Sequence, residues 1–358
     1  MRRCQPSTLE ICASRANLAI RKYVSASQPD LLHLKRIEMI QIEHLSKSFG
    51  PRRVVDDLTF TVERGEVMGF LGPNGAGKST AMRMVTGFFP PTSGRVLIGG
   101  HDVMDAPLAA KRLIGYLPES AASYPDMTVN GFLLFIAELR GLTGEARKRA
   151  VHRVVERCFL ESVLYQSIET LSKGYRHRTC LAQALIHDPD VLIMDEPTDG
   201  LDPNQKHEVR NLIREMGKTK AVIFSTHILE EVDAACTRAI IIDRGRMVAN
   251  GTPASLKAMA QSAGSVTLRV GGASEAAALE PVRAMCAALP EAAQAEVHGA
   301  GVRVLPRDRA AAAAGATLAS ALVALAEREH WQVAGLHVEE GQLDEVFRSL
   351  TLSDTVHA

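Results

Sequence analysis

Between residues 39 and 256, short apolar runs alternate with longer stretches in which apolar positions recur every three or four residues. Runs of the first kind are typical of buried strands, and stretches of the second kind are typical of amphipathic helices. This alternation predicts an α/β layer architecture. The predicted strands cover residues 40–44, 54–62 in part, 66–71, 95–98, 114–117, 191–194, 221–225 and 239–243. The predicted helices cover residues 79–86, 129–139, 143–159, 175–186, 204–215 and 229–235.

Two parts of the chain depart from this simple alternation. Residues 119–171 carry helical periodicity without strands, so we expect a helical insert over about 119–185 on the sheet core. After residues 251–253 the chain becomes rich in Ala and Val, which predicts a small α+β accessory domain at 257–358. Its predicted strands cover 266–270, the region near 302–305, and 331–338, and its predicted helices cover 275–288, 310–328 and 343–350.

Residues 1–38 carry seven basic and three acidic side chains and lack a compact apolar stretch. A secretory signal needs such a stretch, so we do not expect one here. The Arg- and Ser-rich composition would suit an organelle transit peptide, whereas a disordered extension or a start codon assigned too early is the simpler explanation. We favour the simpler explanation because Met39 immediately precedes a strand pattern, and we expect the first folded domain at 39–256.

Composition and charge narrow the classes of function. Lys plus Arg and Asp plus Glu each number 41, so no chain-wide basic surface argues for nucleic acid, and no nucleic-acid partner is expected. The six cysteines include no C-x-x-C pair, which favours a reducing compartment. The sequence has no strongly apolar run of about eighteen residues. The nearest candidate, 310–326, is mostly Ala and predicts a soluble helix rather than a membrane span.

The strongest chemical motif is the octapeptide at 72–79, which matches G-x-x-x-x-G-K-[ST] between an apolar strand and a helix. Its glycines let backbone N–H groups turn toward phosphate oxygens, and the helix N-terminus adds partial positive charge. Lys78 is expected to meet the β- and γ-phosphates of a nucleotide, and Ser79 to ligate Mg²⁺. The twelve histidines form no metal-binding pattern, so this nucleotide-linked Mg²⁺ is the metal that we expect. The candidate ATP-binding residues of this segment are Gly72, Pro73, Asn74, Gly75, Ala76, Gly77, Lys78, Ser79 and Thr80.

A second motif is the apolar strand at 191–194, which ends in two carboxylates, Asp195 and Glu196. Open α/β sheets bind ligands at the carboxyl ends of their strands, and adjacent side chains of a strand point to opposite faces. We therefore expect Asp195 to hold the Mg²⁺ shell and Glu196 to polarise the attacking water. Alone, such a pair would be an ordinary solvated strand end, but here it accompanies a phosphate-binding loop.

The pentapeptide Leu171-Ser172-Lys173-Gly174-Tyr175 makes this arrangement resemble the ATP-binding cassette (ABC) ATPases. It looks like the family signature L-S-G-G-Q, with Lys173 and Tyr175 in place of Gly and Gln. The resemblance implies a P-loop NTPase core with an antiparallel β subdomain, and a head-to-tail dimer that encloses two ATP molecules. It also implies that Ser172 and Gly174 meet the γ-phosphate held by the opposite subunit. Alternatively, Ser172 is only the N-cap of the helix that follows.

Two further family landmarks concern the nucleotide. Phe49 resembles the aromatic residue that stacks on adenine, although it would also suit an apolar strand end. The segment 114–119 looks like the one that carries the coupling Gln of the family, which is replaced here by Glu119. A carboxylate at that position still allows coordination of Mg²⁺ but changes its charge.

The remaining landmarks concern the dimer loop and the switch histidine. Asp199 and Asp202 lie in a segment similar to the loop that crosses the dimer interface, although Asp202 also suits a helix-entry turn. His227 resembles the switch histidine that reaches the γ-phosphate and the attacking water. His177 stands where the family often has Gln, and we expect it on the surface of the signature helix. The candidate catalytic residues are Glu196, His227 and Lys78.

The final segment, 342–351, looks like the L-E-E-V-F-x-x-L-T ending of cassette subunits that serve exporters with separate six-helix permeases. Together with residues 117–119 and the signature, it is most similar to the gliding-motility and multidrug (ABC-2) branch. It would also suit an amphipathic helix packed against its own domain. The resemblance implies a cytoplasmic ATPase, peripheral on the inner face of the cell membrane. Its implied partners are a separately encoded permease and a second ATPase subunit, in a homodimer or pseudo-dimer.

Two other functions stay open at this point. A soluble cassette ATPase acting on DNA or ribosomes would show a long coiled-coil insert, zinc modules or a second cassette, and none occurs in the sequence. A non-hydrolysing, nucleotide-dependent regulator is disfavoured because Glu196 and His227 are both present. The transported substrate is not encoded in this chain, since selectivity belongs to the permease.

Overall fold

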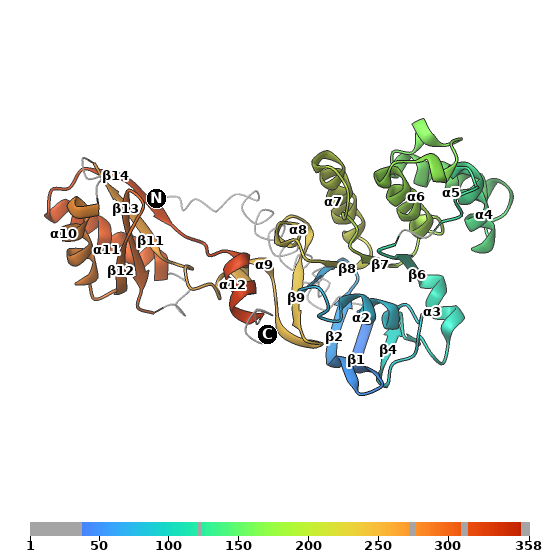
Figure 1. The fold of residues 1–358 in the computed structure, drawn as a ribbon, viewed down its shortest axis with the longest axis horizontal. Coiled ribbons are helices and arrows are strands. Elements are labelled where there is room, and N and C mark those ends of the chain that lie inside the picture. The colour runs from blue at the N-terminus through green and yellow to red at the C-terminus, as the bar shows by residue number, and fades with distance from the viewer. Residues whose placement is uncertain (1–37, 121–122, 272–275, 309–313, 352–358) are drawn as a thin grey trace, which may run out of the picture. The chain divides into compact units, whose positions relative to one another are not determined.

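The computed structural model describes residues 38–120, 123–271, 276–308 and 314–351. Within these ranges the chain forms three sheets with helices between and around them (Figure 1). The expectations for residues 1–37 fall outside the described residues. In the described ranges, every helix is too short or too polar to cross a bilayer.

The sheet that positions the site has six strands in the order β10-β9-β3-β8-β7-β6. Five of them pair in parallel, and β10 joins the edge in the antiparallel sense. Every residue of β3, β7 and β8 is buried, which accounts for their nearly continuous apolar sequences. Because these strands are parallel, the segments that follow them emerge at one edge of the sheet. The strands are β3 (Val67–Leu71), β6 (Ile114–Leu117), β7 (Val191–Asp195), β8 (Ala221–Thr226), β9 (Arg238–Asp243) and β10 (Arg246–Gly251).

A second, antiparallel sheet has the order β2-β1-β4-β5. It shares one hydrophobic cluster with the first sheet and with helix α2 (Lys78–Val85), through residues such as Ile40, Phe70 and Met82. The antiparallel β subdomain that the family resemblance implied is therefore present. Its strands are β1 (Glu38–Phe49), β2 (Arg52–Glu63), β4 (Ser93–Ile98) and β5 (His101–Asp102), followed by helix α3 (Pro107–Leu113).

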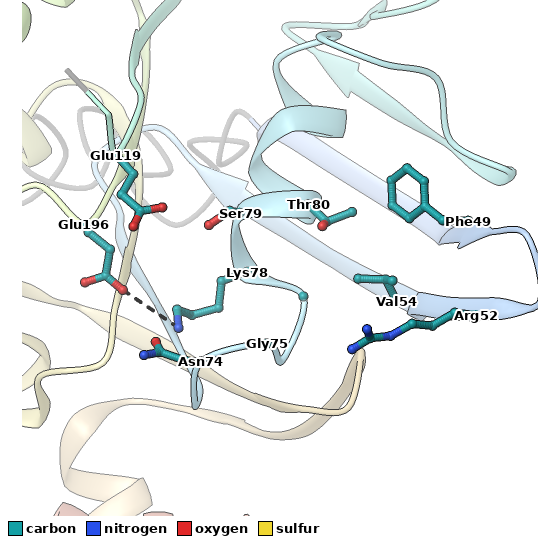
Figure 2. Close-up of a pocket in the computed structure, with 11 residues that line it drawn as sticks. Phe49, Arg52, Val54, Asn74, Gly75, Lys78, Ser79, Thr80, Glu119 and Glu196 are labelled. Atoms are coloured by element: carbon teal, nitrogen blue, oxygen red, sulfur yellow. Dashed lines mark ion pairs between the residues drawn. The ribbon is translucent and has the colours of Figure 1, made fainter. Parts of the chain in front are cut away.

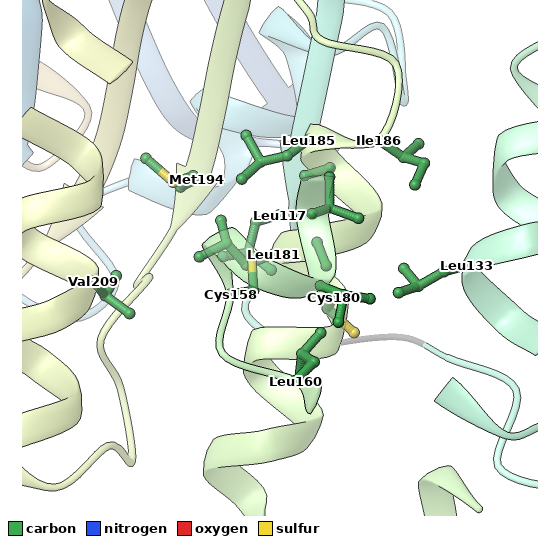
Figure 3. Packing of buried hydrophobic residues seen from close by; sticks show 14 of the residues in the cluster. Leu117, Leu133, Cys158, Leu160, Cys180, Leu181, Leu185, Ile186, Met194 and Val209 are labelled. Carbon is green, nitrogen blue, oxygen red and sulfur yellow. The ribbon is translucent and has the colours of Figure 1, made fainter. Parts of the chain in front are cut away.

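Three helices form the predicted insert and pack against one another (Figure 1). They are α4 (Val129–Leu139), α5 (Gly144–Arg157) and α6 (Lys173–Leu185), with 3-10 turns at Glu161–Val163 and Ile168–Thr170. Figure 3 shows the buried side chains that join them to the main sheet, where Leu133, Leu160 and Leu181 share a cluster with Leu117 of β6 and Met194 of β7. This continuous apolar packing fixes α6, which carries the signature pentapeptide at its start, to the strands that form the site.

The later part of the chain contains its own four-stranded antiparallel sheet, in the order β12-β13-β11-β14, with a separate hydrophobic cluster. Its elements are β11 (Val266–Val270), α10 (Ala276–Ala287), β12 (Ala292–His298), β13 (Gly301–Pro306), α11 (Ala314–Arg328), β14 (Val333–Val338) and α12 (Leu343–Leu350). The predicted start of the helix at 310–328 lies outside the described residues in part. The remaining helices are α7 (Pro203–Gly217) between β7 and β8, α8 (Leu229–Ala235) between β8 and β9, and α9 (Pro253–Lys257) between β10 and β11.

Several elements differ from the pattern-based predictions. Strands β5, β10 and β12 and helices α3 and α9 were not predicted. Strand β5 has only two residues, β10 is a largely exposed edge strand, and β12 is Ala-rich without a clear apolar alternation. Strand β14 begins at Val333 rather than 331, because the Trp331 N–H still donates to the Ala326 carbonyl at the end of α11. The apolar face of α12 packs not on the sheet of its own domain but in a cluster with Leu256 of α9 and Ile241 of β9.

Candidate active site

The loop that follows β3 is shaped by its glycines. Gly77, the N-cap of α2, has φ 103°, and Gly75 has φ 82°, a region of backbone space that favours glycine. A Cβ atom on Gly77 would also lie 2.6 Å from the Val54 carbonyl oxygen of β2. The sequence Gly-x-Gly-Lys therefore permits a tight turn against β2 that a larger residue would prevent.

This loop forms one wall of a cavity of about 420 Å³. Figure 2 shows Glu119 and Glu196 facing Lys78 at one end, with Phe49 and Arg52 at the other. The cavity thus gathers residues from β1, the β3–α2 loop, and the segments after β6 and β7, as the ligand-binding edge of an open α/β sheet does. Its lining residues are Phe49, Arg52, Val54, Asn74, Gly75, Gly77, Lys78, Ser79, Thr80, Glu119 and Glu196.

The other residues of the predicted phosphate loop lie next to this cavity. Pro73 and Ala76 line an adjoining hollow of about 380 Å³, which shares Arg52 and Asn74 with it. The Gly72 carbonyl oxygen accepts a hydrogen bond from Lys78 Nζ at 2.8 Å, and that of Pro73 accepts one at 3.2 Å. The loop is therefore ordered around the lysine ammonium itself.

Glu196 contacts both Lys78 and His227. Lys78 Nζ lies 3.8 Å from Glu196 Oε1, and His227 Nδ1 lies 2.9 Å from Glu196 Oε2. Burial lowers the pKa of Lys78, and this effect is opposed by the nearby Glu196, Asp195 and Glu119 carboxylates. Burial raises the pKa of Glu196, opposed first by its hydrogen bond to His227. A carboxyl with a raised pKa next to a cavity is suited to accept a proton.

Asp195 is fully buried at the end of β7. Its Oδ1 accepts a 2.5 Å hydrogen bond from Ser225 Oγ, whereas its Oδ2 is buried without a hydrogen-bond partner among the described residues. An orphaned buried carboxylate oxygen is what a cation or its water shell would satisfy. Ser79 and Glu119 supply further hard oxygen donors on the cavity wall.

These oxygen donors suit Mg²⁺ bound together with phosphates and water. They do not suit a metal ion held by protein side chains alone. In the described ranges, no three His, Cys, Asp or Glu side chains are grouped so that they could hold a metal ion. Mg²⁺ commonly binds through one or two protein oxygens together with waters and substrate phosphates. The predicted set of Ser79, Asp195 and Glu119 is consistent with that mode.

The predicted signature residues do not join this cavity within one chain. Among the described residues, the cavity lining includes none of positions 171–175. Ser172 caps α6, with its side-chain oxygen accepting a hydrogen bond from Tyr175 N at 3.3 Å, as the simpler alternative predicted. Ser172 and Lys173 are exposed at the start of the helix. Asp202 likewise caps α7, accepting a hydrogen bond from Gln205 N at 2.9 Å.

Lys173, which stands in place of the usual signature Gly, forms an ion pair with Asp199. Lys173 Nζ lies 2.9 Å from Asp199 Oδ2, and the two side chains are 67% and 53% exposed. The lysine side chain also passes directly over Gly200. The signature segment and the predicted dimer loop are therefore joined within one chain, by a contact that the pattern did not predict.

Replacing Lys173 with Gln should raise the pKa of Asp199, because the hydrogen bond from Lys173 is the main cause that lowers it. The change in unfolding free energy should stay within about 1 kcal/mol, since exposed ion pairs contribute little. An NMR pH titration of Asp199 and urea denaturation measure the two quantities. An Asp199 pKa unaffected by K173Q would contradict the contact.

His177 was expected on the surface, and this prediction is wrong. Its side chain is only 3% exposed, and neither ring nitrogen has a hydrogen-bond partner in the described part of the chain. Burial lowers its pKa to about 4, so the ring is neutral at physiological pH. The spacing of His177, Leu181 and Leu185 along α6 is the signal that places it on the buried face.

Sequence patterns also missed a polar network behind the site. Glu196 N donates to Ser225 Oγ at 3.0 Å, and the Thr198 and Thr226 hydroxyls donate to Glu231 of α8. The available signal was the Ser-Thr pair before His227 together with an acidic residue one helical turn later. Thr198, Ser225, Thr226 and Glu231 are buried and do not line the cavity, so we expect them to hold loops rather than to touch a ligand.

Comparison with known proteins adds a family and several relatives. The family described as ABC transporter matches residues 55–199. The chain is 35% identical over 315 residues to the linearmycin resistance ATP-binding protein LnrL of Bacillus subtilis (strain 168), covering 87% of this chain and 98% of the relative. It is 38% identical over 218 residues to the Nod factor export ATP-binding protein I of Paraburkholderia xenovorans (strain LB400), covering 61% of this chain and 72% of the relative. A solved structure described as "Structure of ATP binding subunit of ABC transporter" covers 61% of this chain and 92% of its own, with 30% identity and a TM-score of 0.58.

Proposed function

The chain belongs to the ATP-binding subunits of ABC transporters, and from this premise we propose that its cavity binds MgATP and hydrolyses it to drive export through a separate membrane permease. The observation that carries the proposal is the convergence of Lys78 and Glu196 at the cavity wall, with His227 in contact with Glu196, through distances of 3.8 and 2.9 Å. Sequence likeness alone does not bring these three residues together; the parallel sheet does.

Binding of the triphosphate is assigned to the β3–α2 loop. Its backbone N–H groups and the N-terminus of α2 attract phosphate oxygens, and Lys78 contacts the β- and γ-phosphates. The hydrogen bonds of Lys78 Nζ to the Gly72 and Pro73 carbonyls keep the ammonium beside the loop. Phe49, 51% exposed at the end of β1, offers a ring face for adenine.

Hydrolysis is assigned to in-line attack of water on the γ-phosphorus. Glu196, with its raised pKa, orients the water and accepts its proton, while His227 contacts the γ-phosphate. The hydrogen bond between His227 Nδ1 and Glu196 Oε2 holds the two side chains together at the start of the reaction. Mg²⁺, held by Ser79, Asp195 and Glu119, would neutralise charge on the phosphate oxygens.

We also propose that the signature segment acts on the nucleotide bound by a second copy of the chain or by a related cassette. Ser172 and Lys173 are exposed at the N-terminus of α6, where partial positive charge favours an anion. In a head-to-tail dimer this helix end would seal the γ-phosphate bound by the partner subunit. Asp199 and Asp202 would then lie at the dimer interface.

The export role rests on the relatives. The matched proteins are described as conferring linearmycin resistance and as exporting Nod factor, which supports outward transport for this chain. Because these relatives are named as ATP-binding proteins of transport systems, the permease would be a separate polypeptide that holds this subunit at the inner face of the membrane. The alternatives of a DNA- or ribosome-directed ATPase and of a non-hydrolysing regulator are not favoured by these relatives.

Affinity purification of the tagged chain from detergent-solubilised membranes tests the proposal. We expect an integral membrane protein to co-purify, and the complex to hydrolyse ATP in the presence of Mg²⁺. Purification under the same conditions without detergent is the control for soluble partners. Recovery of ribosomal or DNA-bound material instead of a membrane protein, or a complex without ATPase activity, would overturn the proposed function.

A further inference from the structure

A buried carboxylate that this mechanism does not use connects the two loops of the catalytic edge. Glu231 of α8 is 1% exposed, and each of its oxygens accepts a hydrogen bond from a different threonine. Thr226 Oγ1 donates to Oε2 at 2.7 Å, and Thr198 Oγ1 donates to Oε1. Thr198 lies two residues after Glu196, and Thr226 immediately precedes His227. One carboxylate therefore joins the loops that carry both residues.

The hydrogen bonds of this network are shielded from water. Thr198 is 2% exposed and Thr226 is fully buried, so water does not compete for their hydroxyl groups. A carboxylate buried without a cation is unfavourable unless its oxygens are hydrogen-bonded, and both oxygens of Glu231 are. Its place in the first turn of α8 adds the favourable end of the helix dipole. An apolar residue could fill the same volume but could not fix two loops by hydrogen bonds.

The backbone of Glu196 shows why such fixing matters. Glu196 has φ 52°, a left-handed conformation that a non-glycine residue keeps only when its surroundings impose it. On one side, its N–H donates to the Ser225 carbonyl oxygen at 3.2 Å and to Ser225 Oγ at 3.0 Å. On the other side, the bond from Thr198 to Glu231 holds the chain two residues further on. The strained residue is thus held at both ends against β8 and α8.

We propose that Glu231 is a positioning residue for ATP hydrolysis, which sets the loop of Glu196 and the loop of His227 in register through Thr198 and Thr226. The inference rests on the proposed function, because it assigns Glu231 to the same reaction. Glu231 itself does not touch the cavity. Its effect is on turnover through the 2.9 Å contact between His227 and Glu196, and not on the nucleotide-binding loop around Lys78.

Thr226→Val and Thr198→Val each remove one hydroxyl donor and keep the side-chain shape, and Glu231→Gln leaves at least one hydroxyl without an acceptor. In the full-length chain we expect each to lower kcat at least tenfold while KM for ATP and the nucleotide-binding stoichiometry stay within twofold. Thr226→Ser, which restores the hydroxyl, should recover most of the wild-type kcat. If Glu231→Gln does not fold, the two valine variants carry the test alone.

Thr237→Val is the control for loss of a threonine hydroxyl away from the cavity, at an exposed residue. The Thr237 hydroxyl donates to the Val67 carbonyl at 3.1 Å and accepts from Val67 N at 3.0 Å, at the opposite end of β3 from the cavity. We expect Thr237→Val to lower the melting temperature and the active fraction without changing kcat per bound nucleotide. If Thr198 and Thr226 were only structural, their valine variants would behave in the same way.

The two possible failures are distinguishable. A wild-type chain that does not hydrolyse ATP overturns the proposed function. A wild-type chain that does hydrolyse it, with Thr226→Val and Thr198→Val retaining wild-type kcat per bound nucleotide, overturns only the positioning role of Glu231.

Discussion

Replacing Glu196 with Gln should stop turnover while ATP still binds. Gln keeps the size of the side chain but cannot accept the proton of the attacking water, and general-base catalysis is worth a factor of roughly 100 to 10,000 in rate. The β3–α2 loop around Lys78 is unchanged, so nucleotide affinity should be retained. Because hydrolysis is needed to reopen the proposed dimer, the variant with ATP should accumulate as a dimer. Steady-state ATPase rates and size-exclusion chromatography measure the two effects.

The same variant makes a stability prediction from the pKa of Glu196. Burial raises that pKa, so the folded state disfavours the charged carboxylate. The contribution of Glu196 to stability is therefore complete below its unfolded-state pKa and is lost as the pH rises through the higher folded-state value. At neutral pH the melting temperature of Glu196→Gln should equal or exceed that of wild type. Any such gain should disappear in acid, where the wild-type carboxyl is protonated in both states.

A matched control separates the loss of turnover from a general defect. Glu66 is also largely buried and pairs with Arg238 Nε at 2.5 Å, but it lies before the first residue of β3, at the end remote from the cavity. Glu66→Gln should lower the melting temperature and leave kcat unaltered. Undiminished hydrolysis in Glu196→Gln, or equal losses in both variants, would contradict the assignment of Glu196.

The sequence predicted best those elements whose local signals agree with their packing. The helices at Val129–Leu139, Leu229–Ala235 and Leu343–Leu350 have the predicted bounds. In the first of them a Thr128 N-cap and a buried apolar face occur together. By contrast, β10 is a strand because it pairs with β9 at the sheet edge, and its exposed residues carry little pattern of their own.

Within the site, sequence motifs identified residues that are contiguous or that follow a strand. The loop residues around Lys78, and Glu196 after β7, were found because their chemistry and spacing coincide. Arg52 and Val54 line the same cavity but reach it through the pairing of β2 with β1, which no local motif reports. The Thr198, Thr226 and Glu231 network was missed for the same reason, since it joins separate segments only after folding.

Replacing Lys78 with Ala should weaken ATP binding itself. The loop then loses its ammonium, and a hydrogen bond to a charged group is worth about 1.5–3 kcal/mol, or roughly 10- to 150-fold in affinity. At an ATP concentration that saturates the wild-type chain, the hydrolysis rate of the variant should fall accordingly. Equilibrium binding of a fluorescent ATP analogue measures the loss directly, and unchanged affinity would exclude the role given to Lys78.

The stability of the Lys78 variant separates lost binding from lost folding. Burial lowers the pKa of Lys78, but its ammonium also donates hydrogen bonds to the Gly72 and Pro73 carbonyls, so the melting temperature of each variant without nucleotide is its own baseline. Added ATP should raise the melting temperature of wild type by mass action and leave Lys78→Ala nearly unchanged. Lys220→Ala is the matched control, because Lys220 is also largely buried and pairs with Asp188 at 2.7 Å, away from the cavity. That control should melt at a lower temperature yet keep the full ATP-induced rise. If Lys78 were important only for folding, Lys78→Ala would keep that rise as well.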